Sequence, residues 1–221
     1  MSKRGNTKVQ KTTGGLLLTL FFFSGVCGLA FPLAVVHMMR HVLGPPLFAL
    51  VSILATFLGG VALGSYSAGH CIDVQPGPLK IYGILEGSLG LYYLVFPFMI
   101  RWITPVYTVL YRNGGLSFHT SLLVRYLVFS PLLLIPAVLI GATWPVMGSV
   151  FHGRRNGIGR DMGRVFGIYA LGGCVGALSA GLFMLPGLGA ATAIRLCAGI
   201  DVMICTAAVA LFMKGESGQV F

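Results

Sequence analysis

Long apolar runs separated by short polar stretches repeat six times along this chain of 221 residues. A helix needs about 20 apolar residues to cross the hydrocarbon core of a bilayer, and each run has that length or more. The pattern therefore predicts an all-α fold, a polytopic bundle of six membrane-spanning helices. The predicted helices cover residues 15–39, 47–69, 81–100, 122–150, 165–185 and 190–213.

Two segments depart from this simple pattern. The fourth helix contains Pro131, Pro136 and Pro145, and we expect it to be interrupted there because proline removes a backbone hydrogen-bond donor. Residues 101–121 are rich in aromatic side chains, which favour the headgroup region of a bilayer. The sequence therefore predicts an interfacial stretch between the third and fourth helices.

The composition leaves room for a membrane domain and little else. Hydrophobic residues make up 56% of the chain and charged residues only 9%, which is too apolar for a soluble domain. We divide the chain into a basic tail (1–14), one six-helix transmembrane domain (15–214) and a short second tail (215–221). No polar stretch between the helices is long enough for a soluble catalytic domain, so we do not expect an enzyme.

The basic residues predict the orientation of the chain. Its formal net charge is +10, and most of the lysines and arginines lie in the N-terminal tail and in the loop at 152–164. Basic residues collect on the cytoplasmic side of membrane proteins, so both termini are expected in the cytoplasm. This distribution indicates membrane lipids as partners, including anionic headgroups at the loop, rather than nucleic acid.

The two halves of the chain resemble each other. Gly28-x-x-Phe31-Pro32 corresponds to Gly141-x-x-Trp144-Pro145 at a separation of 113 residues. At a separation of 115 residues, the basic and acidic pair Lys80 and Glu86 corresponds to Arg195 and Asp201. Because each half holds three predicted helices, the second half would cross the membrane in the opposite sense. The sequence thus predicts two inverted three-helix repeats, an architecture found in secondary transporters.

Two acids within the predicted helices are candidate functional residues. Glu86 falls in the third helix and Asp201 in the sixth, and a carboxylate in hydrocarbon is costly unless it faces a cavity or a partner. We therefore predict an intramembrane charged site comprising Glu86, Asp201 and Arg195. The alternative is a structural salt bridge between helices, with Arg125 or Arg195 as the basic partner.

Four glycines have the spacing of helix-packing motifs. Gly60 and Gly64 in the second helix, and Gly172 and Gly176 in the fifth, form small-xxx-small patterns. Such patterns allow two helix backbones to approach closely within a membrane. We expect these four glycines to lie at helix–helix contacts.

The sequence offers little support for a metal or a cofactor. His37 and His41 are four residues apart and share a face of the first helix, so they are candidate ligands for a metal or a haem. No third ligand accompanies them, and the chain has no CxxCH motif for covalent haem attachment. We predict no metal and no cofactor, with haem left as an alternative.

Several stretches are similar to a known family. They are residues 24–31 (SGVCGLAF), 57–69 (FLGGVALGSYSAG), 85–92 (LEGSLGLY) and 141–145 (GATWP). Together they resemble the membrane domain of spermidine synthase-like integral membrane proteins, a domain described as major-facilitator-like, over about residues 15–213. Many members of that family also carry a soluble aminopropyltransferase-like domain. The resemblance implies a protein of the bacterial cytoplasmic membrane. It covers the membrane domain alone, and we expect this chain to lack the aminopropyltransferase-like domain. The resemblance implies architecture more firmly than activity.

Three functions remain open at this level. The first is a non-catalytic membrane subunit that anchors or scaffolds partner proteins, either other subunits or a second copy of this chain. The second is a half-size, transporter-like module that moves a small cation such as a polyamine, with Glu86 and Asp201 at its site. The third is a membrane anchor that holds a haem or a quinone.

Overall fold

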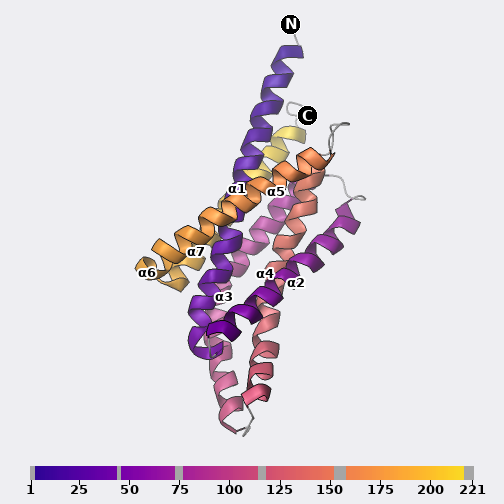
Figure 1. The fold of residues 1–221 in the computed structure, drawn as a ribbon. Helices are drawn as coiled ribbons and strands as arrows, with labels where there is room; N and C mark the ends of the chain where they lie inside the picture. Colours follow the sequence, from indigo (N-terminus) through magenta and orange to yellow (C-terminus); the bar gives the residue numbers. More distant parts are fainter. Residues whose placement is uncertain (1–2, 44–45, 73–76, 114–117, 152–157, 217–221) are drawn as a thin grey trace.

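The computed structural model describes residues 3–43, 46–72, 77–113, 118–151 and 158–216, and these residues form helices with no strand among them. The long helices are α1 (Lys3–Leu43), α2 (Pro46–Ile72), α3 (Pro78–Asn113), α4 (Phe118–Phe151), α5 (Ile158–Ser179) and α7 (Ala190–Glu216). A π-helical turn (Ala180–Met184) and the short helix α6 (Leu185–Leu188) join α5 to α7. Figure 1 shows these helices as one elongated bundle.

Six helices within the described residues are long and apolar enough to cross a bilayer. Their candidate spans are Gly14–Met39, Leu47–His70, Pro78–Pro105, Thr120–Phe151, Gly159–Leu188 and Ala190–Met213. The predicted six-helix membrane bundle is therefore confirmed, and the chain is an integral membrane protein. The beginning of α1 and the end of α7 lie at the same end of the bundle (Figure 1).

The long helices run further than the sequence pattern indicated, most of all α1, α3 and α5. α1 begins at Lys3, within the segment assigned to a tail, and α5 begins at Ile158, within the predicted loop at 152–164. α3 continues through Pro97 and Pro105 to Asn113, so the first part of the predicted interfacial stretch is helical. Hydropathy marks where the apolar part of a helix ends, and these helices extend beyond it into polar sequence.

The prediction that prolines interrupt the fourth helix was wrong. α4 is continuous from Phe118 to Phe151 and contains Pro131, Pro136 and Pro145. Each proline leaves the carbonyl four residues earlier without its usual backbone donor. The hydroxyl of Tyr92 on α3 donates to the Leu132 carbonyl at 2.6 Å, opposite the gap left by Pro136.

The gap left by Pro145 is filled in the same way from another helix. The hydroxyl of Ser65 on α2 donates to the carbonyl of Gly141 at 2.9 Å. Hydroxyls from neighbouring helices thus replace the backbone donors that two of the prolines remove, which is how membrane helices tolerate proline. These hydroxyls lie far from α4 in sequence, so the pattern along α4 could not reveal them.

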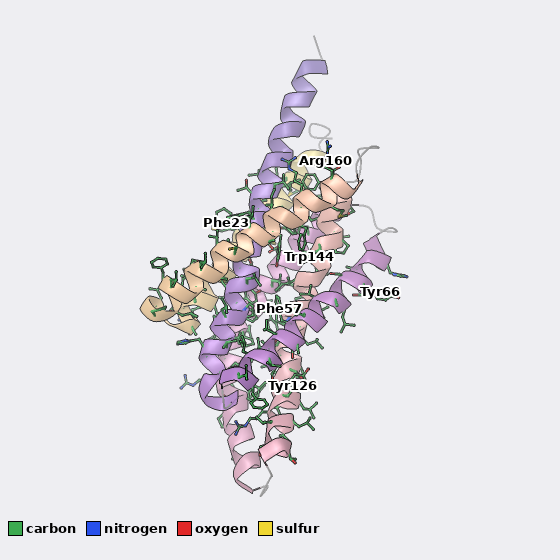
Figure 2. The ribbon with its side chains drawn as sticks, viewed as in Figure 1. Phe23, Phe57, Tyr66, Tyr126, Trp144 and Arg160 are labelled. Atoms are coloured by element: carbon green, nitrogen blue, oxygen red, sulfur yellow. The ribbon has the colours of Figure 1, made fainter. Side chains whose placement is uncertain are left out.

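Replacing Tyr92 by Phe is expected to lower the free energy of unfolding by about 1 kcal/mol, the scale of an interhelical hydrogen bond in a membrane. The carbonyl of Leu132 would lose the donor that replaces the missing proline N–H. The matched control is Tyr66→Phe, because Tyr66 lies on the outer face of α2 and is 73% exposed (Figure 2). Unfolding in mixed detergent micelles measures both variants, and equal stabilities would contradict this role for Tyr92.

The helices pack in pairs that repeat between the two halves of the chain. α1 packs mainly against α5, α4 packs mainly against α2, and α3 packs against α7. α3 also contacts α4 just as α7 contacts α1. If α1, α2 and α3 are exchanged with α4, α5 and α7, respectively, the same pairs of helices are in contact. In Figure 1, α1 runs away from the N-terminal end whereas α4 runs toward it. The packing is therefore that of two inverted three-helix units.

Close contacts at four glycines follow the same exchange. A Cβ atom at any of them would overlap an atom of the neighbouring helix or press closely on its backbone. The contacts are Gly60 with Leu134, Gly64 with Val138, Gly172 with Phe22, and Gly176 with Val26. Each α2–α4 contact thus matches an α5–α1 contact at positions shifted by 112 residues. The structure places these four glycines at helix–helix contacts, where the absent side chain lets the backbones meet.

Candidate functional site: a buried acidic pair between α3 and α7

The site lies where α3 and α7 run side by side in opposite directions. Glycines on α3 bring the two helices together, because Gly87 packs against Cys205 and Gly90 against Val202. The two contacts are equivalent in the repeat, because Gly87 and Gly90 lie 115 residues before Val202 and Cys205, respectively. The same shift carries Glu86 onto Asp201. The two acids therefore occupy equivalent places in the two inverted units, on two helices that pack against each other.

Glu86 is completely buried and has one strong hydrogen bond. Its side chain is 0% exposed, and the hydroxyl of Ser24 on α1 donates to its Oε1 atom at 2.7 Å. Its Oε2 atom has no hydrogen-bond partner among the residues that the structure describes. Tyr82 lies one turn earlier on α3, close to the carboxyl group, and its buried hydroxyl is also unpartnered there. Glu86 thus keeps one oxygen available for a further ligand.

Asp201 is equally buried and has fewer polar contacts. It is 1% exposed, and within the described part of the chain neither of its oxygens has a hydrogen-bond partner. Glu86 is close enough for the two carboxyl groups to interact electrostatically. The thiols of Cys27 on α1 and Cys197 on α7 also lie near Asp201. The Cys27 thiol points to the backbone carbonyl of Cys197 at 3.7 Å.

Aromatic side chains surround the two acids. Tyr93 on α3 is fully buried and stacks on Phe31 of α1, with ring centroids 4.2 Å apart. Tyr169 on α5 packs against Phe21 of α1 at 5.0 Å and against Trp144 of α4 at 5.4 Å. Figure 2 shows Trp144 in this central region of the bundle. The walls of the site are therefore apolar rings that carry a few polar atoms at their edges.

The segment that contains Ser24 is fixed in position by its glycines. A Cβ atom at Gly25 would overlap the backbone carbonyl of Tyr169, and one at Gly28 would overlap the Tyr169 hydroxyl. One face of this part of α1 therefore rests directly on α5. The adjacent face carries Ser24 and Cys27 toward the two acids. The close α1–α5 contact thus sets the position of the hydroxyl that binds Glu86.

The structure brings Glu86 and Asp201 together and leaves Arg195 apart from them. Arg195 lies on an exposed position of α7, whereas Asp201 faces the interior. Arg125 does not bond to the acids either, since the only hydrogen bond to either carboxyl group in the described chain comes from Ser24. Within the residues that the structure describes, neither predicted salt bridge to the acids is present, and the exposed Arg195 lies apart from them. Asp201 follows Arg195 by six positions, which rotates the two side chains about 120° apart around the helix and places them on different faces.

The candidate histidine ligands are only partly within the described residues. His37 is partly buried on α1, and the side chain of His41 lies outside the described part of the chain. Among the residues that the structure describes, no group of three or more His, Cys, Asp and Glu side chains could hold a metal ion. The polar atoms at the acidic pair are mainly carboxyl and hydroxyl oxygens.

Sequence reasoning found the two acids and missed the groups around them. Ser24, Tyr82 and Tyr93 were not among the predicted site residues. Tyr82 precedes Glu86 by four residues, which places both on one helical face, and that spacing was a usable signal. Nothing in the local sequence connects Ser24 to Glu86, because 62 residues separate them and only the packing of α1 brings them together.

No protein-family model, curated protein or solved structure matches this chain.

Proposed function

We propose that this protein is a transporter-like membrane module that binds and moves a small cation at the Glu86–Asp201 pair. One observation carries the proposal. Three carboxyl oxygens of this pair lie buried inside a membrane bundle with no hydrogen-bond donor or basic side chain bonded to them within the described chain. An unneutralised buried charge costs several kcal/mol even after the protein relaxes. Two neighbouring carboxyl groups in this position require protons or another cation.

The location of the pair supports movement of the cation as well as binding. In inverted-repeat transporters the ion site lies between the repeats, near the middle of the bilayer, and the repeats rock around it. The strongest contacts divide the bundle into two groups, in which α4 packs against α2 and α3 and α1 packs against α5 and α7. Glu86 and Asp201 lie on α3 and α7, the main contact between these two groups. A change in the relative tilt of the two packed groups would open the pair first to one side of the membrane and then to the other. A dimer of this chain would provide twelve helices around such a path.

Charge movement in proteoliposomes tests the proposal. Vesicles that contain the protein are challenged in turn with concentration jumps of H⁺, Na⁺, K⁺ and a linear polyamine, and the resulting current is recorded on a solid-supported membrane. We expect a current with at least one of these cations, and no current from a Glu86→Gln, Asp201→Asn double variant. Equal currents from the two proteins would reject the acidic pair as the site. Wild-type vesicles that stay silent with every cation would reject transport.

A membrane subunit that anchors partner proteins is the second candidate. The outer faces of α2 and α5 expose large apolar side chains such as Leu58, Leu63, Leu171 and Leu178, which suit contact with lipid or with another membrane helix. Gly59 on the same face of α2 has open space beside it, so another helix could approach closely there. Extraction in mild detergent followed by mass spectrometry tests this candidate. Stoichiometric protein partners would support it, and a visible absorbance band would indicate a haem.

Family and cellular location extend the proposal. The stretches at 24–31 and 141–145 support membership in the spermidine synthase-like membrane proteins, and with it a bacterial cytoplasmic membrane. The basic residues that flank α1 and α5 support a cytoplasmic location for both termini. Reporter fusions at the C-terminus, active on only one side of the membrane, would test this orientation.

A further inference from the structure

We propose that the cation carried at this site is the proton, and that it passes along a column of four buried groups, Tyr82, Glu86, Asp201 and Tyr93. This inference rests on the proposed transport function and assigns the ion. It is carried by the order of the four groups along the bundle and by the unpartnered polar atom that each of them holds.

The register of α3 and α7 gives the order of the column. Gly87 packs against Cys205 and Gly90 against Val202, so residue numbers rise along α3 as they fall along α7. This register places Asp201 near the level of Leu91, about 7 Å beyond Glu86 along the helix axis. Tyr82 lies about 6 Å before Glu86 on α3, and Tyr93 lies about 3 Å beyond the level of Asp201. The four groups therefore follow one another from one side of the membrane toward the other.

Each group in the column can both accept and release a proton. The unpartnered atoms are the hydroxyl oxygens of Tyr82 and Tyr93, Oε2 of Glu86, and both carboxyl oxygens of Asp201. A tyrosine hydroxyl can accept a proton and donate its own in the same step. A carboxyl group can receive a proton on one oxygen and release one from the other. Each group holds the same number of protons after one has passed, and rotation of its O–H bond restores the starting orientation, so the relay needs no other reactant.

The surroundings of the column favour a proton over a larger ion. Within the described chain, the other titratable side chains that interact with the acids are the thiols of Cys27 and Cys197 and the phenol of Tyr169, and none of these is basic. The buried rings of Phe21 and Phe31 pack against Tyr82 and Tyr93, the two ends of the column. Apolar rings cannot replace the hydration shell of a metal ion. A proton needs only hydroxyl and carboxyl groups within reach of one another or of a bridging water.

The column covers a substantial part of the membrane. From Tyr82 to Tyr93 it extends about 16 Å, roughly half of the hydrocarbon thickness of a bilayer. Chains of acidic groups in this position are typical of proton relays in pumps and transporters. On either side of the column, water completes the path when it enters between the two packed groups as they change their tilt.

Proton uptake into proteoliposomes tests the inference with a readout separate from total charge. The vesicles contain a pH-sensitive dye, and a K⁺ gradient with valinomycin supplies the driving voltage. We expect acidification in wild-type vesicles and a rate about tenfold lower for Tyr93→Phe, the scale of one lost hydrogen-bonding group. Tyr66→Phe, which alters an exposed phenol on α2, is the matched control and should match the wild type.

The outcomes separate this inference from the proposed function. A current driven by Na⁺ or a polyamine without acidification would overturn the proton assignment and leave transport intact. Silence with every cation would remove both. A Tyr93→Phe variant that acidifies vesicles at the wild-type rate would exclude Tyr93 from the path. If that variant does not fold, wild-type protein in D₂O still tests the proton assignment, because a proton relay slows in D₂O and a metal-ion path does not, so an unchanged rate would overturn it.

Discussion

A leucine at Gly64 is expected to destabilise the bundle by about 3 kcal/mol or more, at the upper end of the range for overpacking. Any Cβ atom there would overlap the carbonyl oxygen of Val138 and lie 3.0 Å from the backbone nitrogen of Ala142. Both atoms belong to the backbone of α4, which cannot move aside as a flexible side chain would. The α2–α4 pair would have to separate. Thermal unfolding and size-exclusion chromatography in detergent measure the loss.

Glycines on the same helices provide matched controls. Gly59 on α2 and Gly167 on α5 have nothing within 4 Å of an added Cβ atom. We expect Gly59→Leu and Gly167→Leu to leave stability close to that of the wild type. Because Gly176 meets the carbonyl of Val26 as Gly64 meets that of Val138, Gly176→Leu should cause a loss similar to that of Gly64→Leu. Equal tolerance at Gly59 and Gly64 would contradict the helix pairing described above.

Replacing Glu86 by Gln is expected to reduce cation-driven charge movement to the level of empty vesicles. The amide cannot take up and release a proton or a cation at the position where Ser24 holds the carboxyl group. Asp201→Asn should have an effect of the same size, because the two acids are equivalent members of one pair. Ser24→Ala keeps both acids and removes only the 2.7 Å hydrogen bond, so a partial loss of about tenfold is expected.

An acid outside the core controls for the loss of charge. Asp161 lies in the first turn of α5, away from the buried pair, and Asp161→Asn changes the net charge by the same amount. This variant should conduct as the wild type does. A similar loss in Asp161→Asn and Glu86→Gln would indicate that net charge, rather than the buried pair, controls the current.

The fold was largely predictable because the membrane imposes it. Burying backbone groups in hydrocarbon requires helices of a minimum length, so six long apolar runs predict six spans. The continuity of α4 was not predictable from α4 itself. Local rules treat Pro136 and Pro145 as breaks, and the hydroxyls of Tyr92 and Ser65 that compensate for them come from other helices.

The candidate site was predictable in part for a similar reason. A carboxyl group within an apolar run is rare enough to be noticed, so Glu86 and Asp201 were found by inspection of single helices. Which residues surround an acid depends on helix rotation and register. Arg195 was therefore assigned to the site although its side chain is exposed, and Ser24 was missed although it bonds to Glu86. The repeat, by contrast, was a long-range signal in the sequence itself, and it correctly paired Glu86 with Asp201 in equivalent places.

The central claim is that the buried carboxyl pair takes up and releases a cation inside the membrane, and infrared spectroscopy tests it most directly. Difference spectra are recorded on reconstituted protein as the proton and cation concentrations are changed. Our account predicts a carbonyl-stretching band from a protonated carboxyl group that changes with these concentrations and is lost in Glu86→Gln or Asp201→Asn. A carboxyl spectrum that is unchanged by the ions, or the same in wild type and both variants, would contradict it.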